Sequence, residues 1–195
     1  MASNFWHNPG VEPKRNFRFQ LHISAAPELT WLVKTCEKPK VNVSTVPHKF
    51  INHTFNYPGR VVWNPVAITL VDTPFGDRGD TSQTAVDFLR QSGYRVPLTG
   101  QGGGDAETNL DRAATNIEKE LAVNALGGIS AVTIEQLQNL TDGTGPGVID
   151  RWTLHNAVIT GDINFGTLDY ASEDLTTVSF TFQYDWATFN PQPTT

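Results

Sequence analysis

The chain has few charged side chains, a single cysteine and no long apolar run. Charged residues make up 17% of its 195 residues. Cys36 has no second cysteine, which excludes an internal disulfide and a zinc site built on cysteines. No apolar run approaches the length that spans a membrane, and residues 1–14 lack the apolar core of a signal peptide. We therefore expect a protein that is made and used without membrane insertion or secretion through a membrane.

The net charge and the lack of known catalytic motifs exclude several classes of function. The formal net charge is -6, whereas a protein that holds nucleic acid tightly needs a basic patch to displace counterions. DNA could still slide past such a protein. The glycine-rich residues 100–104 are not followed by the Gly-Lys-Ser/Thr of a phosphate loop. His48 and His53, five residues apart, would fall on opposite faces of one regular strand. We expect no enzymatic activity, no metal and no cofactor.

The clearest structural pattern is an alternation near the end of the chain, from Leu175 to Trp186. Apolar side chains occupy every second position, while hydroxyl, amide and acidic side chains occupy the positions between them. This period of two predicts a strand with one apolar and one polar face. The apolar set is Val178, Phe180, Phe182, Tyr184 and Trp186, and the polar set is Thr177, Ser179, Thr181, Gln183 and Asp185.

Similar strand patterns and frequent turn residues predict a mainly β protein, a sandwich or partial barrel with one or two outer helices. The chain contains 16 glycines and 12 prolines. Further strands are expected at 15–23, 29–36, 40–57 with a break near Pro47, 60–71 after a turn at Pro58-Gly59, 129–137 and 151–165 with bends at Asn156 and Gly161. Helices are expected at 81–92, capped by Asp80 or Thr81, and at 105–127. We expect one domain over 1–195, with an N-terminal arm (1–14), an insertion with a helix (95–128) and a loose tail (187–195).

Two segments resemble a known family. The C-terminal segment contains Leu168-Asp169-Tyr170, then Ser172-Glu173-Asp174, then a Thr/Ser-alternating strand that ends in Tyr184-Asp185-Trp186. This order resembles the signature of tail tube proteins from contractile-tailed bacteriophages, most closely the longer tube proteins of marine phages. Residues 39–72 resemble the same family through a projecting hairpin, a Pro-Gly turn and the Trp63-Asn64-x-Val66 strand.

The resemblance implies a structural virion protein of the phage tail, assembled in the host cytoplasm. Copies would form hexameric rings that stack into a continuous β-barrel tube, with the tail sheath, baseplate and tail-terminator proteins as partners. Genomic DNA would pass through without specific binding. Two alternatives stay open: a stacked-ring tube or tube-initiating baseplate protein of another contractile injection system, and a carbohydrate-binding β-sandwich that uses some of the five tryptophans.

Two sets of residues are the candidate site. Neutral hydroxyl and amide side chains on the polar strand faces are expected to line the tube: Asn42, Ser44, Asn52, Thr54, Asn56, Thr177, Ser179, Thr181 and Gln183. A wall of this kind has no cations that would pair with phosphates. The projecting hairpin and the N-terminal arm are expected to contact the next ring through Val46, Pro47, His48, Lys49, Phe50, Ile51, Phe5 and Trp6.

Overall fold

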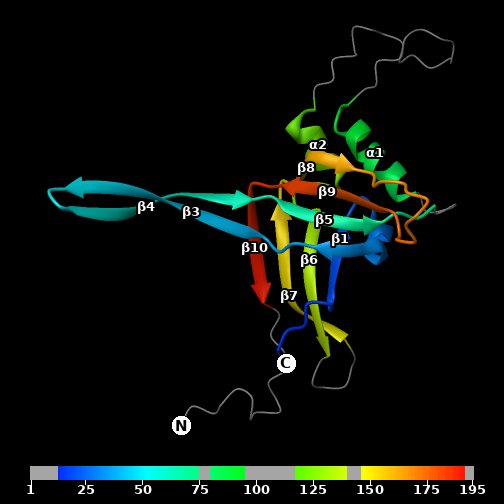
Figure 1. Cartoon of the computed structure of the whole chain (residues 1–195), viewed down its shortest axis with the longest axis horizontal. Coiled ribbons are helices and arrows are strands. Elements are labelled where there is room, and N and C mark those ends of the chain that lie inside the picture. Colours follow the sequence, from blue (N-terminus) through cyan, green and yellow to red (C-terminus); the bar gives the residue numbers. More distant parts are fainter. Residues whose placement is uncertain (1–12, 75–79, 95–116, 140–145, 192–195) are drawn as a thin grey trace, which may run out of the picture.

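The computed structural model describes residues 13–74, 80–94, 117–139 and 146–191. In these ranges, two four-stranded antiparallel sheets pack against each other, and a long two-stranded arm extends away from them (Figure 1). No helix in the described ranges is both long enough and apolar enough to cross a membrane. The predicted mainly β architecture is confirmed.

The two sheets interleave segments from both ends of the chain. The first sheet has the order β1 (Phe19–Ile23), β6 (Val132–Asn139), β7 (Pro146–His155) and β10 (Trp186–Pro191). The second has the order β2 (Val33–Cys36), β5 (Val66–Val71), β9 (Thr177–Gln183) and β8 (Val158–Asn164). A 3-10 helix, η2 (Pro27–Leu32), precedes β2 and occupies part of the predicted strand at 29–36, because proline suits the first turn of a helix.

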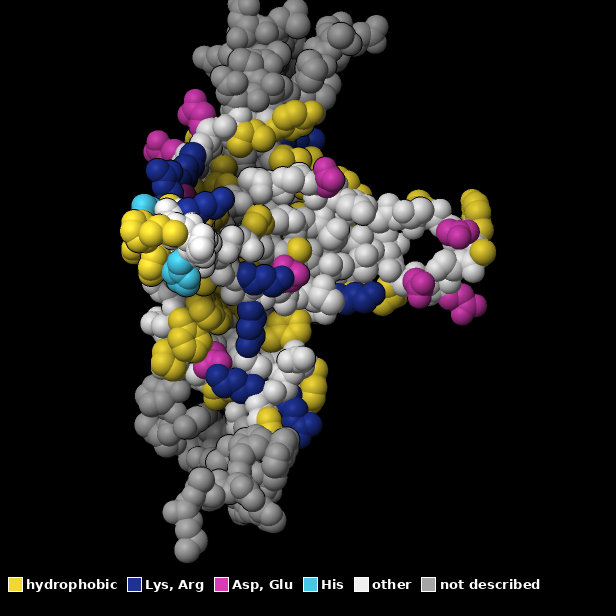
Figure 2. Space-filling model, turned by 60° about the vertical axis from the view of Figure 1, so that its left-hand side comes forward, with side chains coloured by type: hydrophobic (Ala, Val, Ile, Leu, Met, Phe, Trp, Pro, Cys, Tyr) yellow, Lys and Arg dark blue, Asp and Glu magenta, His cyan; other side chains and the backbone are white. Residues whose placement is uncertain are grey.

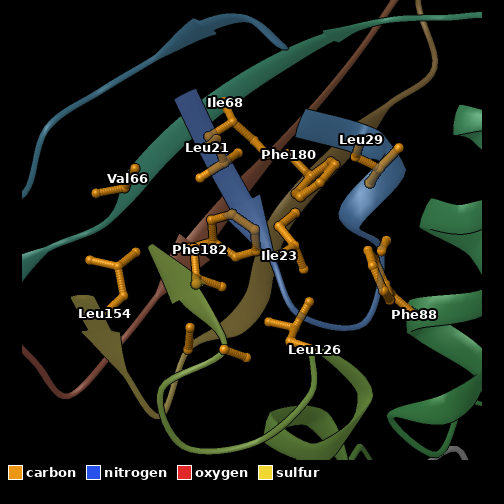
Figure 3. Close-up of a cluster of buried hydrophobic side chains, with 14 of the residues drawn as sticks. Leu21, Ile23, Leu29, Val66, Ile68, Phe88, Leu126, Leu154, Phe180 and Phe182 are labelled. Atoms are coloured by element: carbon orange, nitrogen blue, oxygen red, sulfur yellow. The ribbon is translucent and has the colours of Figure 1, made fainter. Parts of the chain in front are cut away.

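The core lies between the sheets and confirms the period-two pattern of β9. Val178, Phe180 and Phe182 are buried, while the residues between them are half-buried. Phe182 points into a cluster that includes Leu21 of β1 and Leu154 of β7 (Figure 3). Inward side chains of both sheets therefore fill one interior, as alternation along paired strands requires.

The C-terminal prediction is wrong in two respects. The strand that was expected to run to Trp186 ends at Gln183, and Trp186 begins β10 with 44% of its surface exposed. The segment expected to be a loose tail is a strand as far as Pro191, paired with β7. The chain changes sheets at Asp185, where hydrogen bonds to neighbouring segments replace continuation of the ladder.

Two helices cover the end of the sandwich next to β8 (Figure 1). Helix α1 (Thr81–Gln91) is confirmed, and the Asp80 side chain accepts a hydrogen bond from the Ser82 N–H at 2.8 Å. The chain leaves this helix through Gly93, whose φ is 105°. Helix α2 (Lys119–Ala125) is the described part of the helix predicted at 105–127, and residues 105–116 lie outside the described ranges.

The predicted bends between β7 and β9 are also confirmed. Asn156 has a φ of 54° in the turn from β7 to β8, and Gly161 has a φ of 73°. The pairing register of β8 on β9 shifts between Thr160 and Asn164, around that glycine. The hairpin expected from these two strands therefore forms, with β8 antiparallel to β9.

The arm consists of β3 (Lys40–Phe50) and β4 (His53–Asn64), which pair with each other over their whole length. The predicted break near Pro47 and the predicted turn at Pro58-Gly59 are both wrong, because the strands run straight through these positions and turn at Ile51 and Asn52. A two-stranded ribbon leaves one edge of each strand unpaired, and proline is tolerated at such an edge.

Candidate functional site

The outward face of the second sheet carries hydroxyl and amide groups. Thr177, Ser179, Thr181 and Gln183 project from β9 opposite the buried core residues and are half-buried. The pairing register extends the face onto β5, where Thr69 pairs with Ser179, and onto β8, where Thr160 pairs with Thr181. The structure thus brings together the four wall residues that were predicted on this strand.

This surface, the hydroxyl face, is uncharged at all its paired positions. They are Thr35, Ala67, Thr69, Val71, Val158, Thr160, Asn164, Thr177, Ser179, Thr181 and Gln183. Sequence reading missed those on β2, β5 and β8, because only strand pairing shows that they share a face with β9. Such positions can form hydrogen bonds with water or a passing molecule, and none of them offers an ammonium or guanidinium group that would hold a phosphate. The nearest cation in sequence is Lys34, which is exposed in the bulge of the edge strand β2.

The arm is amphipathic, and its apolar face changes sides halfway along. Near the body, Val41, Val43, Val61 and Trp63 share one face by register. Beyond Ser44 the apolar and aromatic side chains lie on the other face: Val46, Phe50, Phe55 and Tyr57, together with His48 and His53. The change occurs at a bulge, where two residues of β4 oppose one residue of β3.

The bulge also lets the arm turn over. The Ser44 Oγ accepts a hydrogen bond from the Arg60 N–H at 2.9 Å. Bulges increase the twist of a ribbon, and Figure 1 shows β3 and β4 crossing over about midway along the arm. The ribbon therefore crosses over near the point where its apolar face changes.

The remaining predicted wall residues therefore lie apart from the hydroxyl face. Asn42 is on the polar side near the body, Thr54 and Asn56 are on the polar side beyond the bulge, and Ser44 is in the bulge itself. Asn52 is in the turn at the tip. All five are exposed on the arm rather than on the second sheet.

The residues predicted to contact a neighbouring ring occupy the outer half of the arm. Val46, Pro47, His48, Lys49, Phe50 and Ile51 are all exposed, and Phe5 and Trp6 lie outside the described residues. The expectation that His48 and His53 face opposite ways is wrong, because the turn lies between them and register places both on one face. Among the described residues, no cluster of three or more His, Cys, Asp or Glu side chains could hold a metal.

Tyr184, Asp185 and Trp186 join several parts of the molecule at one corner. Lys119 of α2 donates to both carboxylate oxygens of Asp185, at 2.8 and 2.7 Å, and the Asn156 side chain donates to one of them at 2.7 Å. These two interactions, that of Lys119 first, lower the pKa of Asp185. Trp186 stacks on His155 with ring centroids 5.1 Å apart, and the buried Tyr184 ring lies 6.0 Å from Trp63 at the base of the arm.

A buried polar cluster lies at the far end of the first sheet, beside a cavity of about 300 Å³. Arg151 Nε donates to Glu135 at 2.5 Å, and Lys14 forms an ion pair with Asp150. Both acids are buried, and each is paired with a basic side chain. This arrangement is that of structural ion pairs rather than a catalytic acid and base.

Comparison with known proteins rests on structure alone. No protein-family model matches the chain, and no curated protein matches its sequence. A chain in the cryo-EM structure of the anti-feeding prophage tube-terminating cap superposes over 98% of this chain and 100% of its own length, with a TM-score of 0.61 and 14% identity. The two chains share a fold.

Two further structures agree with this result. A chain of the sheath-tube complex of the extracellular contractile injection system PVC, in the extended state, has a TM-score of 0.57 and 13% identity, covering 94% of this chain and 95% of its own. A chain of the PVC sheath/tube terminator has a TM-score of 0.58 and 12% identity, covering 93% and 99%. At these identities, the comparisons establish a common fold.

Proposed function

We propose that the chain is a structural subunit of the inner tube of a contractile machine. The observation that carries this proposal is the superposition on a chain of the anti-feeding prophage cap structure, which spans practically the whole of both chains. The shared fold is therefore the complete architecture rather than one common motif. A structural role also agrees with a candidate surface made of neutral side chains and an exposed arm, neither of which provides a nucleophile with an adjacent base.

The strand edges give a physical reason for assembly into hexameric rings. Each sheet ends in two edge strands, β1 and β10 in the first sheet and β2 and β8 in the second. Unpaired edges can pair with further strands, and closing a ring of copies satisfies them. The rings would then stack into a tube, with the arm of each copy contacting the next ring through Val46–Ile51.

The hydroxyl face is the proposed wall of the tube. Its outward positions carry no charge at any paired residue, while the chain as a whole is acidic. A polyanion would then meet hydroxyl and amide groups without ion pairs, and the acidic background would repel it weakly. We propose that the cargo is phage DNA and that the tail sheath, baseplate and terminator proteins are partners, because the C-terminal motifs resemble phage tube proteins.

A second candidate is a tube or tube-initiating subunit of an extracellular injection system. The structural neighbours favour it, since the PVC structures are of an extracellular contractile injection system. The two candidates share the tube and differ in cargo. The carbohydrate-binding alternative has less support, because Trp63 and Trp152 pack against the core rather than forming an open platform.

The wall assignment is tested by adding cations to it. Thr181→Lys combined with Gln183→Lys should leave tube assembly intact but make purified tubes retain short double-stranded DNA, with release as salt is raised. In assembled particles, the same change should slow genome ejection. The matched control is Thr188→Lys with Asn190→Lys, which places the same charges on the outward face of the first sheet. If only the control tubes retained DNA, the tube wall would be the outward face of the first sheet. If neither variant retained DNA, the proposal of a tube that conducts DNA would be rejected.

A further inference from the structure

Charge is divided unequally between two segments of the chain. The arm, Lys40–Asn64, contains Lys40, Lys49 and Arg60 but no Asp or Glu, although the chain as a whole has a net charge of -6. Residues 152–195 show the reverse, with five acidic side chains and no Lys or Arg: Asp162, Asp169, Glu173, Asp174 and Asp185. One segment therefore lacks acids and the other lacks bases, and two of these charges are already paired, Lys40 with Glu37 and Asp185 with Lys119.

The basic segment ends in an exposed apolar tip. We define the arm tip as residues 45–58, the part of the arm beyond the bulge. Phe50 is 60% exposed and Ile51 is 86% exposed. Lys49 lies beside them and forms no ion pair with any carboxylate in the described ranges, so both its charge and the neighbouring apolar surface are open to a partner.

The acidic segment includes a loop with complementary properties. We define the acidic loop as residues 165–175, which connects β8 to β9 and is exposed throughout. Leu168 is 87% exposed and Tyr170 is fully exposed, and they flank Asp169. Asp169 accepts the Ala171 N–H at 2.9 Å, which fixes the turn without neutralising the carboxylate. Among the described residues, no Lys or Arg forms an ion pair with the three acids of this loop.

The acidic loop also borders a hollow. A cavity of about 440 Å³ is lined by Leu168, Asp169, Asp174 and Leu175, together with backbone and threonine atoms at the start of β9. Figure 2 shows the loop projecting from the body around an opening, with acidic and hydrophobic side chains at its rim. The hollow falls within the size range of about 300–1,000 Å³ in which pockets bury apolar groups.

We propose that the arm tip of one copy docks into the acidic loop of a second copy of this chain. Phe50 and Ile51 would enter the hollow, and Lys49 would pair with Asp169 or Asp174. This inference rests on the proposed tube and names the surfaces that join its subunits. It commits to a second copy because the two surfaces are complementary in charge, because both expose apolar side chains, and because both belong to the same chain.

The positions of the two surfaces exclude contact within one copy. Figure 1 shows the arm and the loop between β8 and β9 at opposite ends of the long axis. An interface between two different surfaces of identical subunits is head-to-tail, and it produces closed rings or open stacks according to the rotation between copies. Placement at opposite ends of the body is compatible with such a head-to-tail repeat.

A charge exchange tests the docking. Lys49→Glu alone and Asp169→Lys with Asp174→Lys alone should each raise the concentration needed for assembly at least tenfold in sedimentation velocity. The three changes combined should restore most of the loss, because the opposed charges are then exchanged. The controls are Arg90→Glu and Glu120→Lys, two exposed sites on the helices, which should leave assembly unchanged. Circular dichroism of each variant confirms that the body has folded.

A cross-link locates the contact directly. In a Cys36→Ala background, Lys49→Cys on one copy and Asp169→Cys on another should give a disulfide-linked dimer when mixed, whereas either variant alone should not. Hollow tubes could form although no cross-link appears and the charge exchange has no effect. That result would overturn the docking and leave the tube proposal intact. Cross-linked, exchange-sensitive assemblies that are not hollow would keep the docking and overturn the tube. Cross-linking of the loop only to an added sheath protein would assign the loop to that partner and overturn the docking.

Discussion

The corner at Asp185 gives a stability prediction whose size follows from exposure. Asp185→Asn keeps the shape of the side chain but removes the charge that accepts hydrogen bonds from Lys119 and Asn156. The lysine and aspartate side chains are 62% and 39% exposed. Water screens the pair, so its contribution falls within the range of about 0.2–1 kcal/mol for surface ion pairs. Because Lys119 contacts both carboxylate oxygens, we place the contribution near the upper end of that range. We expect a loss of about 1 kcal/mol in the free energy of unfolding, a fall in Tm of roughly 2–4 °C.

The pH dependence of this effect has a definite sign. The pKa of Asp185 lies below its ordinary value of 3.8 in the folded chain, so the unfolded chain binds the proton more readily. The stabilisation is therefore fully present above about pH 5 and is lost as the pH falls through the folded pKa. The difference between the wild type and Asp185→Asn should accordingly shrink toward zero in acid.

Urea unfolding of dispersed protein measures the effect, with Asp162→Asn as the control. Asp162 is exposed and lies in the same acidic segment, and within the described ranges it forms no ion pair. A double-mutant cycle that combines Asp185→Asn with Lys119→Met isolates the interaction of the two side chains. It should give a coupling free energy of about 0.5–1 kcal/mol. A loss above about 3 kcal/mol, or one that persists unchanged at pH 2, would refute the reasoning, since either result requires a buried role that this corner does not have.

Four further predictions concern the arm and the cysteine. A Cβ at Gly59 would lie 2.4 Å from the Ser44 Oγ and 3.1 Å from its carbonyl oxygen, so Gly59→Ala should disturb the bulge and shorten tubes in electron micrographs without lowering the unfolding midpoint; full-length tubes would contradict this. Deletion of residues 47–53 should give rings that do not stack, and normal tubes would reject the contact assigned to the arm. Burial, with the neighbouring Glu37 second, raises the pKa of Cys36 to about 12, so a thiol reagent at pH 8 should label it slowly in the native chain and rapidly in urea. Equal rates would refute its burial. The same shift should lower stability as pH rises above 9.0, where the thiol of the unfolded chain ionises first.

Local sequence patterns predicted the elements whose environment is set by near neighbours. The alternation of β9 identified its buried side chains, because a strand with a core on one side repeats every two residues. The Asp80 cap and Gly93 located α1, and Asn156 and Gly161 marked real changes of backbone direction. These signals depend on one residue and its immediate surroundings, which a single sequence contains.

Features that depend on pairing could not be predicted in the same way. Pro47 was read as a break, yet an arm with unpaired edges accommodates it. Trp186 continued the apolar alternation in sequence, but the chain changes sheets at Asp185 and the alternation restarts in β10. The residues of the hydroxyl face on β5 and β8 could be identified only from the pairing register of these strands with β9. The apolar side of the arm likewise needed the position of the bulge.

The most direct test of the central claim is a cryo-EM reconstruction of the purified wild-type chain at assembling concentration. The account predicts hollow rods of stacked rings whose inner surface is the hydroxyl face, with Thr181 and Gln183 pointing into the channel. A chain that stays monomeric at every concentration, or rods in which these side chains face outward, would contradict it.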